Sequence, residues 1–132
     1  MRILIVDDNE MVRRGVAALL SSRAKWEVCG EAGNGTEALE KAIELCPDLI
    51  LLDISMPGAN GLEVARILRH ELPDAKIVIM SQHDPIQLLP RAIAAGADAC
   101  VDKGSLGTAL LPTIEAVRGQ TRAKVAGPVN QT

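Results

Sequence analysis

Short apolar runs alternate with amphipathic segments along most of the chain. The apolar runs cover residues 3–6, 26–29, 49–52, 75–80 and 99–101. Each is followed by a segment with apolar residues at helical spacing, and these segments cover about residues 10–22, 36–46, 62–71, 86–95 and 108–118. Strands in strict alternation with helices predict one α/β domain, a (βα)5 unit whose doubly wound, five-stranded parallel sheet has helices on both faces.

The periodicity within these segments predicts which residues form the core. The inward positions are Met11, Val12, Val16, Leu19 and Leu20 in the first helix, and Ala38, Leu39, Ala42, Ile43 and Cys46 in the second. Cys29 is also expected in the core, on a second strand that Gly30 ends. The run at 49–52 is apolar throughout, which is typical of a strand covered by helices on both faces.

Two prolines fall inside or near predicted helices. Pro90 lies within 86–95, where a proline removes a backbone hydrogen bond, so we expect this helix to begin late, near Pro90, or to be kinked. Pro112 is compatible with a last helix that begins near residues 108–111, because the first turn tolerates proline. After Gly119 the hydrophobic periodicity ends. Residues 1–119 are therefore expected to form the domain, and residues 120–132 a linker or disordered tail.

Polar residues stand at or just after the carboxyl ends of four predicted strands. Asp7 and Asp8 follow the first strand, Asp53 the third, Ser81 the fourth and Lys103 the fifth. In an open parallel sheet these ends meet at one edge, where binding sites lie. Three converging carboxylates repel one another strongly, so either one of them binds a proton or the group binds a hard cation such as Mg²⁺. With a lysine and a hydroxyl nearby, such a centre is equipped for phosphoryl transfer to a carboxylate.

Composition restricts the class of protein further. The 132 residues are 48% apolar and 23% charged, which is the balance of a single soluble domain. With a net charge of −3 and Trp26 as its only aromatic residue, the chain has neither a basic nor a stacking surface for nucleic acid. The 3 cysteines lack disulfide or zinc-ligand spacing. No run approaches the ~20 apolar residues of a membrane span, and a cytoplasmic location is expected.

Related classes of α/β protein fit the chain poorly. The acidic loop at residues 7–10 would repel the phosphate of a flavodoxin-like cofactor, and the first strand is not followed by a GxGxxG dinucleotide motif. Phosphohydrolases that phosphorylate a strand-end aspartate carry a second aspartate two residues later, where this chain has Ser55. Asp7 and Asp8 also have a purely structural explanation, as the cap and the first-turn charge of the following helix.

A set of residues at fixed spacing carries a family resemblance. The set consists of Asp7-Asp8, Asp53, Met56-Pro57, Gly61, Ser81 and Lys103. With it, the chain resembles the receiver (phosphoacceptor) domain of two-component response regulators over about residues 1–119. Further local motifs resemble the NarL/FixJ-type (LuxR-family) branch: Gly30-Glu-Ala-Gly-Asn-Gly35, Pro47-Asp48, Ser81-Gln-His-Asp84 and Ala95-Gly-Ala-Asp98. The resemblance implies a flavodoxin-like receiver fold with strand order 2-1-3-4-5.

The resemblance also implies a role for each site residue. Asp53 would accept a phosphoryl group from a sensor histidine kinase or phosphotransfer protein. Asp8, Asp53 and the backbone carbonyl of Ser55 would bind Mg²⁺, and Asp7 would assist, largely through water. The phosphoryl oxygens would be bound by Ser81 and Lys103. Such a protein catalyses its own phosphorylation and slow dephosphorylation only, and is otherwise no enzyme.

A signalling face and an output follow from the same resemblance. The face consists of helix 86–95, strand 99–101 and helix 108–118, and homodimers are expected through it or through the first and last helices. A helix-turn-helix DNA-binding domain, absent from this chain, would regulate transcription. The segment itself is expected to contact neither nucleic acid nor membrane. A stand-alone receiver is the close alternative.

Particular positions on the fourth and fifth strands and the loop after the fourth strand set this chain apart. Cys100 stands where the family usually has tyrosine or phenylalanine, so the usual aromatic switch cannot operate unchanged. Gln82 replaces a small residue and either crowds the phosphoryl group or contributes a hydrogen bond. His83 either overhangs the site or is solvated. Because of Cys100, a degenerate receiver that acts only as an interaction module stays open. A small Mg²⁺-dependent phosphohydrolase is a further alternative, against which Ser55 argues.

Overall fold

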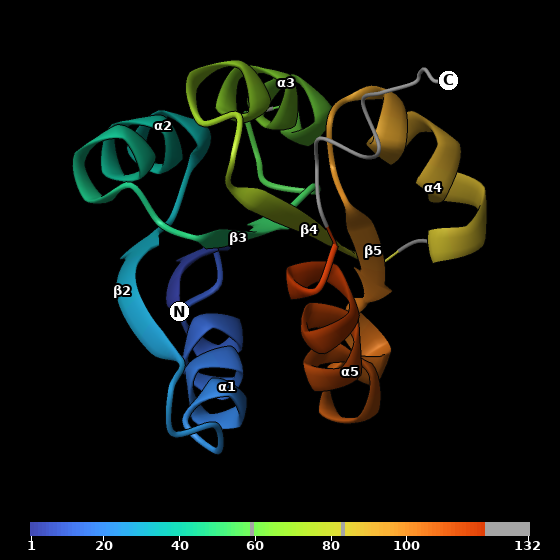
Figure 1. Cartoon of the computed structure of the whole chain (residues 1–132). Helices are drawn as coiled ribbons and strands as arrows, with labels where there is room; N and C mark the ends of the chain where they lie inside the picture. Colours follow the sequence, from blue (N-terminus) through green and yellow to red (C-terminus); the bar gives the residue numbers. More distant parts are fainter. Residues whose placement is uncertain (59, 83, 121–132) are drawn as a thin grey trace.

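Five parallel strands form one sheet in the order β2-β1-β3-β4-β5 (Figure 1). The computed structural model describes residues 1–58, 60–82 and 84–120. Along the chain the elements are β1 (Arg2–Val6), α1 (Glu10–Leu20), β2 (Glu27–Ala32), α2 (Gly35–Leu45), β3 (Leu49–Asp53), α3 (Gly61–Glu71), β4 (Lys76–Ser81), α4 (Pro85–Ala94), β5 (Ala99–Asp102), the 3₁₀ turn η1 (Lys103–Ser105) and α5 (Leu106–Arg118). The (βα)5 topology and the strand order predicted from the sequence are confirmed.

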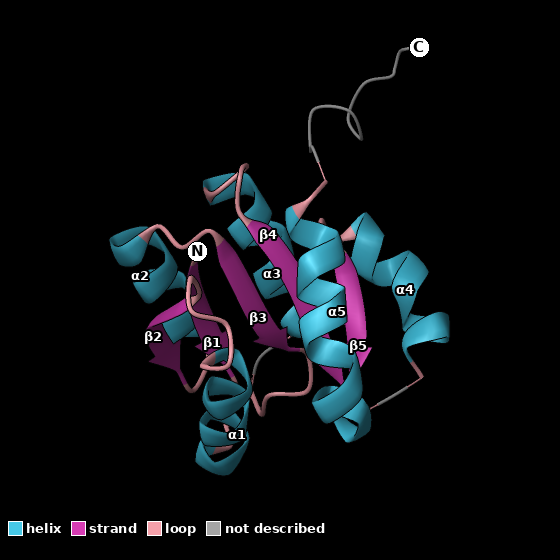
Figure 2. Cartoon of the chain, turned by 60° about the horizontal axis from the view of Figure 1, so that its bottom comes forward, coloured by secondary structure: helices cyan, strands magenta, loops and turns pink. Residues whose placement is uncertain are grey.

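Helices cover both faces of the sheet. α2, α3 and α4 lie on one face, while α1 and α5 lie on the other (Figures 1 and 2). Alternate residues of the central strands enter the two cores: on β1, Leu4 and Val6 face the first set of helices, and Ile3 and Ile5 face the second. Every residue of β3 is buried, as the unbroken apolar run predicted. Because helices cover both faces of the sheet, we expect the functional side chains at the ends of the strands.

Helix caps explain how the chain turns at the carboxyl ends of the strands. The Asn9 side chain accepts hydrogen bonds from the N–H groups of Met11 and Val12, and so caps α1. Asn34 and Asn60 cap α2 and α3 in the same way. The alternative explanation of Asp7 or Asp8 as the cap of the first helix is wrong, because Asn9 occupies that position. Both carboxylates remain available at the edge of the sheet.

The second strand differs from its predicted extent. Gly30 does not end the strand; it lies within β2, which continues to Ala32. The register between β1 and β2 shifts between Ile3 and Leu4, and this irregularity keeps the longer strand paired. A Cβ atom on Gly30 would lie 2.6 Å from Cδ1 of Leu45, so α2 packs against the strand at the glycine. The prediction that the strand ends at Gly30 is wrong, because this glycine permits close packing against α2 and does not form a turn.

Both helices that contain proline begin earlier than predicted. α4 begins at Pro85, not near Pro90, because the Asp84 side chain accepts a hydrogen bond from the N–H of Ile86 and caps the helix there. A kink at Pro90 stays a prediction. α5 begins at Leu106, so Pro112 lies in its interior and not in its first turn. The preceding 3₁₀ turn, capped by Asp102, starts the helical backbone early.

Several predicted core residues lie near the surface. Met11 is 73% exposed and Ile43 54% exposed. Ile43 follows the buried Ala42 by one residue, which turns it about 100° away from the buried face of α2. Cys46 is exposed because it caps the end of α2 in a left-handed conformation with φ 47°, and Cys29 is half-buried on the edge strand β2. Four residues of the predicted stripes are buried as expected: Val16 and Leu20 of α1, and Ala38 and Ala42 of α2.

The described part of the chain ends two residues after the last helix, and the predicted domain boundary at residue 119 stays a prediction. α5 ends at Arg118, and the carbonyl of Gln120 accepts a hydrogen bond of 2.9 Å from Nζ of Lys76. The predicted linker or tail at 120–132 lies, apart from Gln120, outside the described residues. Its assignment stays a prediction.

Candidate functional site

Three buried polar side chains lie at the carboxyl ends of adjacent strands. Asp7 directly follows β1, while Asp53 and Ser81 are the last residues of β3 and β4. All three are at most 1% exposed, and they are the buried polar residues of the described chain. Asp8, one residue after Asp7, is exposed. The sheet therefore brings together the acidic residues that the sequence places far apart.

Lys103 completes the group from the end of β5. Its Nζ atom lies 2.7 Å from Oδ2 of Asp7 and 3.3 Å from Oδ2 of Asp53. The Lys103 side chain is only 11% exposed. It begins the 3₁₀ turn η1, which Asp102 caps by accepting a hydrogen bond from the N–H of Gly104. This short turn directs the lysine back over the sheet.

Backbone N–H groups hold the two buried carboxylates in the same manner. Oδ1 of Asp7 accepts a 2.9 Å hydrogen bond from the N–H of Asn9, and Oδ1 of Asp53 accepts a 2.9 Å bond from the N–H of Ser55. The other oxygen of each carboxylate faces Lys103. Each carboxylate thus has one oxygen occupied by the backbone and one directed into the shared centre.

Burial and charge shift the pKa values of this group. Burial raises the pKa of the Asp53 carboxyl and the charge of Asp7 adds to the rise, while the Ser55 N–H and Lys103 offset it only in part. Burial acts to lower the pKa of Lys103, but the close carboxylates of Asp7 and Asp53 outweigh burial and raise that pKa. Lys103 is therefore a cation at neutral pH, and one cation faces three carboxylates.

The carboxylates fit a hard metal ion. One oxygen from each of Asp7, Asp8 and Asp53 can be chosen so that all three lie within 4.8 Å of one another. Oδ2 of Asp7 is buried and, within the described chain, accepts no hydrogen bond of good geometry, although Lys103 lies close to it. Oxygen donors with excess negative charge are the ligands that Mg²⁺ prefers. The residues present therefore suit Mg²⁺.

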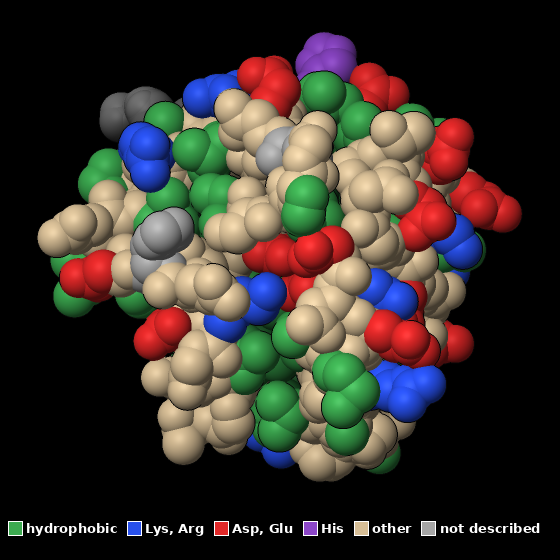
Figure 3. Space-filling model, turned by 180° about the vertical axis from the view of Figure 1, so that it is seen from behind, with side chains coloured by type: hydrophobic (Ala, Val, Ile, Leu, Met, Phe, Trp, Pro, Cys, Tyr) green, Lys and Arg blue, Asp and Glu red, His purple; other side chains and the backbone are tan. Residues whose placement is uncertain are grey.

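A cavity of about 390 Å³ opens beside Lys103. It is lined by Val12 of α1, the exposed Gln82, Asp102, Lys103 and Gly104. Figure 3 shows acidic side chains gathered near the middle of the face opposite to the view of Figure 1, with basic side chains beside them. His83, the other residue predicted to modulate the site, lies outside the described residues.

A family model described as the response regulator receiver domain matches residues 3–115. The chain belongs to this receiver domain family. Receiver domains act in signalling, generally require Mg²⁺, and generally interact with histidine kinases or phosphotransfer proteins. The acidic group of Asp7, Asp8 and Asp53 in this receiver domain suits that metal requirement.

The relatives of this receiver domain include transcriptional regulators. The chain is 38% identical over 132 residues to the transcriptional regulatory protein LiaR of Bacillus subtilis, covering 98% of this chain and 63% of LiaR. It is 37% identical over 118 residues to the response regulator GacA of Pseudomonas viridiflava, covering 89% of this chain and 54% of GacA. The chain therefore spans less than two thirds of the length of these relatives.

Solved structures of the LuxR branch share the fold. A two-component response regulator of the LuxR family from Aurantimonas sp. SI85-9A1 is 34% identical, with a TM-score of 0.83 over 90% of this chain and 86% of that one. The receiver domain of the putative response regulator NarL from Mycobacterium tuberculosis is 34% identical, with a TM-score of 0.80 over 90% of this chain and 97% of that one. The predicted membership in the LuxR/NarL branch is confirmed.

Cys100 occupies the strand-five position at which the family usually has an aromatic residue. It lies on β5 opposite Ile79 of β4 and is half-buried against the core under α2, α3 and α4. Burial raises the pKa of the Cys100 thiol to about 11. The thiol is therefore protonated at neutral pH and packs as a small apolar group.

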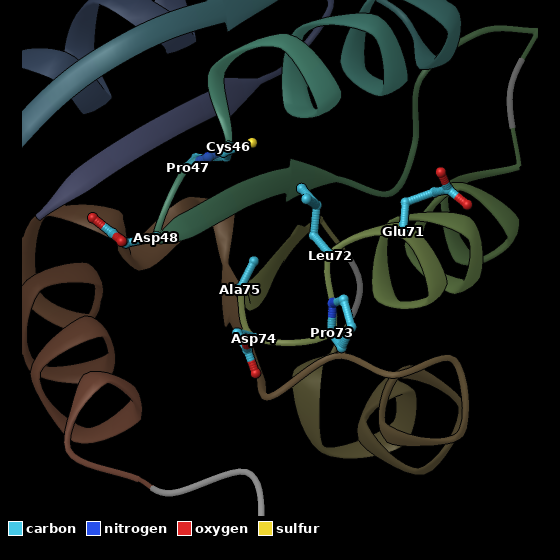
Figure 4. Close-up of a pocket in the computed structure, with 8 residues that line it drawn as sticks. All are labelled: Cys46, Pro47, Asp48, Glu71, Leu72, Pro73, Asp74 and Ala75. Carbon is cyan, nitrogen blue, oxygen red and sulfur yellow. The ribbon is translucent and has the colours of Figure 1, made fainter.

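A second cavity, of about 250 Å³, lies at the opposite end of the sheet (Figure 4). Its lining residues come from the loop before β3 and from the end of α3 with the loop before β4: Cys46, Pro47, Asp48, Glu71, Leu72, Pro73, Asp74 and Ala75. It contains none of the predicted site residues. The parts of the chain that the structure describes also include no helix with the length and apolar content needed to cross a membrane.

Sequence pattern does not single out one residue next to the site. Arg13 of α1 donates a 2.6 Å hydrogen bond from Nη1 to the carbonyl oxygen of Asp7 and a 2.8 Å bond from Nε to Oε1 of Glu31. An arginine near the start of an amphipathic helix is ordinarily a solvated residue. The signal for its role is the contact with Asp7, which only the folded structure shows.

Proposed function

We propose that Asp53 accepts a phosphoryl group in a Mg²⁺-dependent reaction. The carrying observation is that a buried carboxylate, with one oxygen held by the Ser55 N–H, directs its other oxygen toward Lys103 between two further aspartates. An oxygen of Asp53 forms the new bond to phosphorus, while the bond from phosphorus to a nitrogen of the donor histidine breaks and the imidazole leaves.

The metal would be held by Asp8 and Asp53 with the backbone carbonyl of Ser55, and Asp7 assists, largely through water. Mg²⁺ supplies neutralisation of the charge on the phosphoryl oxygens. Lys103 supplies the second positive charge, because it lies within 3.3 Å of Asp53 and remains protonated. Ser81, buried at the end of β4, donates its hydroxyl hydrogen bond to a phosphoryl oxygen. Gln82, at the rim of the adjoining cavity, limits access or contributes a further bond.

The donor is a sensor histidine kinase or a phosphotransfer protein, and the reaction belongs to the cytoplasm. The family, with its general requirement for such partners, supports this assignment. Beyond its own phosphorylation and slow dephosphorylation, the domain of residues 1–119 catalyses no reaction. Ser55 supports that limit, because it stands where related phosphohydrolases carry an acid–base aspartate.

Phosphorylation would shift a two-state equilibrium of the face formed by α4, β5 and α5. Homodimers form through this face or through α1 and α5. In the whole protein the output is transcription, regulated through a C-terminal helix-turn-helix domain that binds DNA. The similarity to LiaR, whose name describes a transcriptional regulatory protein, supports this output. Cys100, which replaces the usual aromatic residue, favours a second candidate, an interaction module that does not switch.

Intact mass measured after incubation with acetyl phosphate and Mg²⁺ tests the proposal. We expect one added phosphoryl group on the wild type and on Asp74→Asn, an exposed carboxyl at the opposite end of the sheet. We expect none on Asp53→Asn and none when EDTA removes Mg²⁺. Equal phosphorylation of Asp53→Asn would refute Asp53 as the acceptor. Unchanged amide resonances of α4 and β5 after phosphorylation would instead favour the interaction module.

A further inference from the structure

Arg13 lies where α1, β1 and β2 meet, behind the acidic centre. Its guanidinium bridges two elements: Nη1 donates to the carbonyl oxygen of Asp7 at 2.6 Å, and Nε donates to the carboxylate of Glu31 on β2 at 2.8 Å. The Arg13 side chain is 19% exposed. The Glu31 carboxylate therefore orients the guanidinium, and the guanidinium in turn binds the backbone at the end of β1.

The contact fixes the peptide that joins the two neighbouring aspartates. The carbonyl of Asp7 belongs to the peptide unit between Asp7 and Asp8. On its other side, the N–H of Asp7 donates a 3.0 Å hydrogen bond to the carbonyl of Ala32. Arg13 is therefore one of the contacts that hold the chain where it leaves β1, and the one that binds the peptide between Asp7 and Asp8.

Asp8 depends on this backbone for its position. Its carboxylate is exposed, and across residues 1–58, 60–82 and 84–120 no hydrogen bond or ion pair restrains it. Yet one of its oxygens lies within 4.8 Å of oxygens of Asp7 and Asp53. Asp7 and Asp53, by contrast, are each held by a backbone N–H and by Lys103. Within the described chain, the direction of the Asp8 carboxylate therefore depends on the backbone alone, unlike those of Asp7 and Asp53.

We propose that Arg13 is a positioning residue for the metal: by holding the Asp7 carbonyl, it directs the Asp8 carboxylate toward Asp53. The inference rests on the proposed Mg²⁺-dependent function and adds a residue that touches neither metal nor phosphoryl group. Outer partners that orient metal ligands commonly change metal affinity by about 10-fold to 100-fold when they are removed. The same size of effect is expected here.

Charge alone predicts the opposite result. Arg13 is a cation close to the site, so its removal lowers the repulsion felt by an incoming Mg²⁺ and should tighten binding. Loss of positioning weakens binding. The direction of the change therefore separates the two effects. Arg14 is a matched control, because it is the next residue of α1, carries the same charge, is 71% exposed and pairs with the exposed Glu10 at 2.9 Å.

Titration of the protein with MgCl₂, followed by calorimetry and by amide resonances, tests the inference without a phosphorylation readout. We expect Arg13→Gln to weaken Mg²⁺ affinity about 10-fold. Arg13→Lys keeps the charge but replaces the rigid guanidinium fork with a single ammonium on a flexible chain, so we expect a smaller weakening. Arg14→Gln should leave the affinity unchanged or slightly tighter. Circular dichroism checks that each variant is folded, and Arg13→Lys carries the test if Arg13→Gln does not fold.

Three results would overturn the inference. Mg²⁺ affinity of folded Arg13→Gln equal to or tighter than that of the wild type would show that charge, not positioning, is its contribution. Arg14→Gln as weak as Arg13→Gln would show a general effect of the helix. A Mg²⁺ affinity of Arg13→Lys equal to that of the wild type would show that the guanidinium bridge between Asp7 and Glu31 is not needed. All three leave the proposed function standing, whereas a wild type that binds no Mg²⁺ contradicts the proposed function as well.

Discussion

Two groups of charged residues lie at opposite ends of the sheet, and they are built differently. At the carboxyl ends of β1 and β3, Asp7 and Asp53 share a single lysine, and Asp8 adds a third carboxylate. At the amino ends of β4 and β5, Arg69 pairs with Asp98 at 2.9 Å, one cation with one anion. The Asp98 side chain is 3% exposed. One group carries excess charge and the other is balanced.

The balanced group is also saturated with hydrogen bonds. The guanidinium of Arg69 donates to carbonyl oxygens on both sides of it, those of Gly96, Leu72, Pro73 and Ala75. Oδ2 of Asp98 accepts a further 2.9 Å bond from the N–H of Ile77. The pair thereby joins the end of α3 and the start of β4 to the turn that leads from α4 into β5. Its contacts serve the fold.

The unbalanced group shows what a functional site retains at a cost in stability. Burial and the charge of Asp7 raise the pKa of Asp53, so its ionised form is less favourable in the folded chain than in the unfolded chain. Arg69 and Asp98 leave no comparable excess charge. Excess charge in a buried position is useful where a cation and a phosphoryl group are to be bound, and that use explains why it persists.

Breaking the balanced pair should have the largest effect. Asp98→Ala removes the carboxylate that pairs with the largely buried Arg69 guanidinium and that accepts from the N–H of Ile77. We expect a loss of about 3–5 kcal/mol in the free energy of unfolding, measured by urea denaturation. Asp74→Ala, an exposed carboxylate nearby, should change it by less than about 0.5 kcal/mol. Equal losses in the two variants would show that the pair has no special weight.

Neutralising one carboxylate of the unbalanced group should raise the free energy of unfolding, by less than the loss expected for Asp98→Ala. Asp53→Asn keeps the side-chain shape and removes a charge whose pKa is raised by burial and by Asp7. In Mg²⁺-free buffer at neutral pH we expect a gain of about 1 kcal/mol, the ordinary size of a point substitution's effect. Because the folded pKa is raised, the penalty of the charge is absent below the ordinary pKa of aspartate and grows as pH rises through the raised value.

The gain should therefore disappear when unfolding is measured below the ordinary pKa of aspartate. A wild type that is more stable than Asp53→Asn at neutral pH without Mg²⁺ would contradict the difference between the two groups. So would a gain that persists unchanged at low pH.

Strand periodicity and strand-end polar residues were enough to predict the alternating (βα)5 sheet and the meeting of Asp7, Asp53 and Ser81, whereas the strand order came from the family resemblance. The reason is geometric: parallel strands bring their carboxyl ends to one edge whatever the sequence distance between them. Helix limits were less predictable. Asp84 and the 3₁₀ turn after Asp102 begin α4 and α5 before their prolines, and such local caps outweigh the cost of one missing hydrogen bond.

Residues that act through long-range contacts with backbone carbonyls were not predictable. Arg13 and Arg69 look like ordinary helix-surface arginines in sequence, because the carbonyls they bind lie on other elements. Cys46 was placed in the core by its spacing, yet it ends α2 in a left-handed conformation and is exposed. Periodicity describes the face of a helix and says nothing of what happens one residue beyond its end.

The dependence of the free energy of unfolding on Mg²⁺ tests the central claim most directly, that the excess charge of Asp7, Asp8 and Asp53 is a metal site. A ligand that binds only the folded state stabilises it by about 2.7 kcal/mol at 100 times its dissociation constant. We predict stabilisation of this kind in the wild type and in Asp74→Asn, and its loss in Asp53→Asn. Urea midpoints that do not respond to Mg²⁺, or that respond equally in Asp53→Asn, would contradict the account.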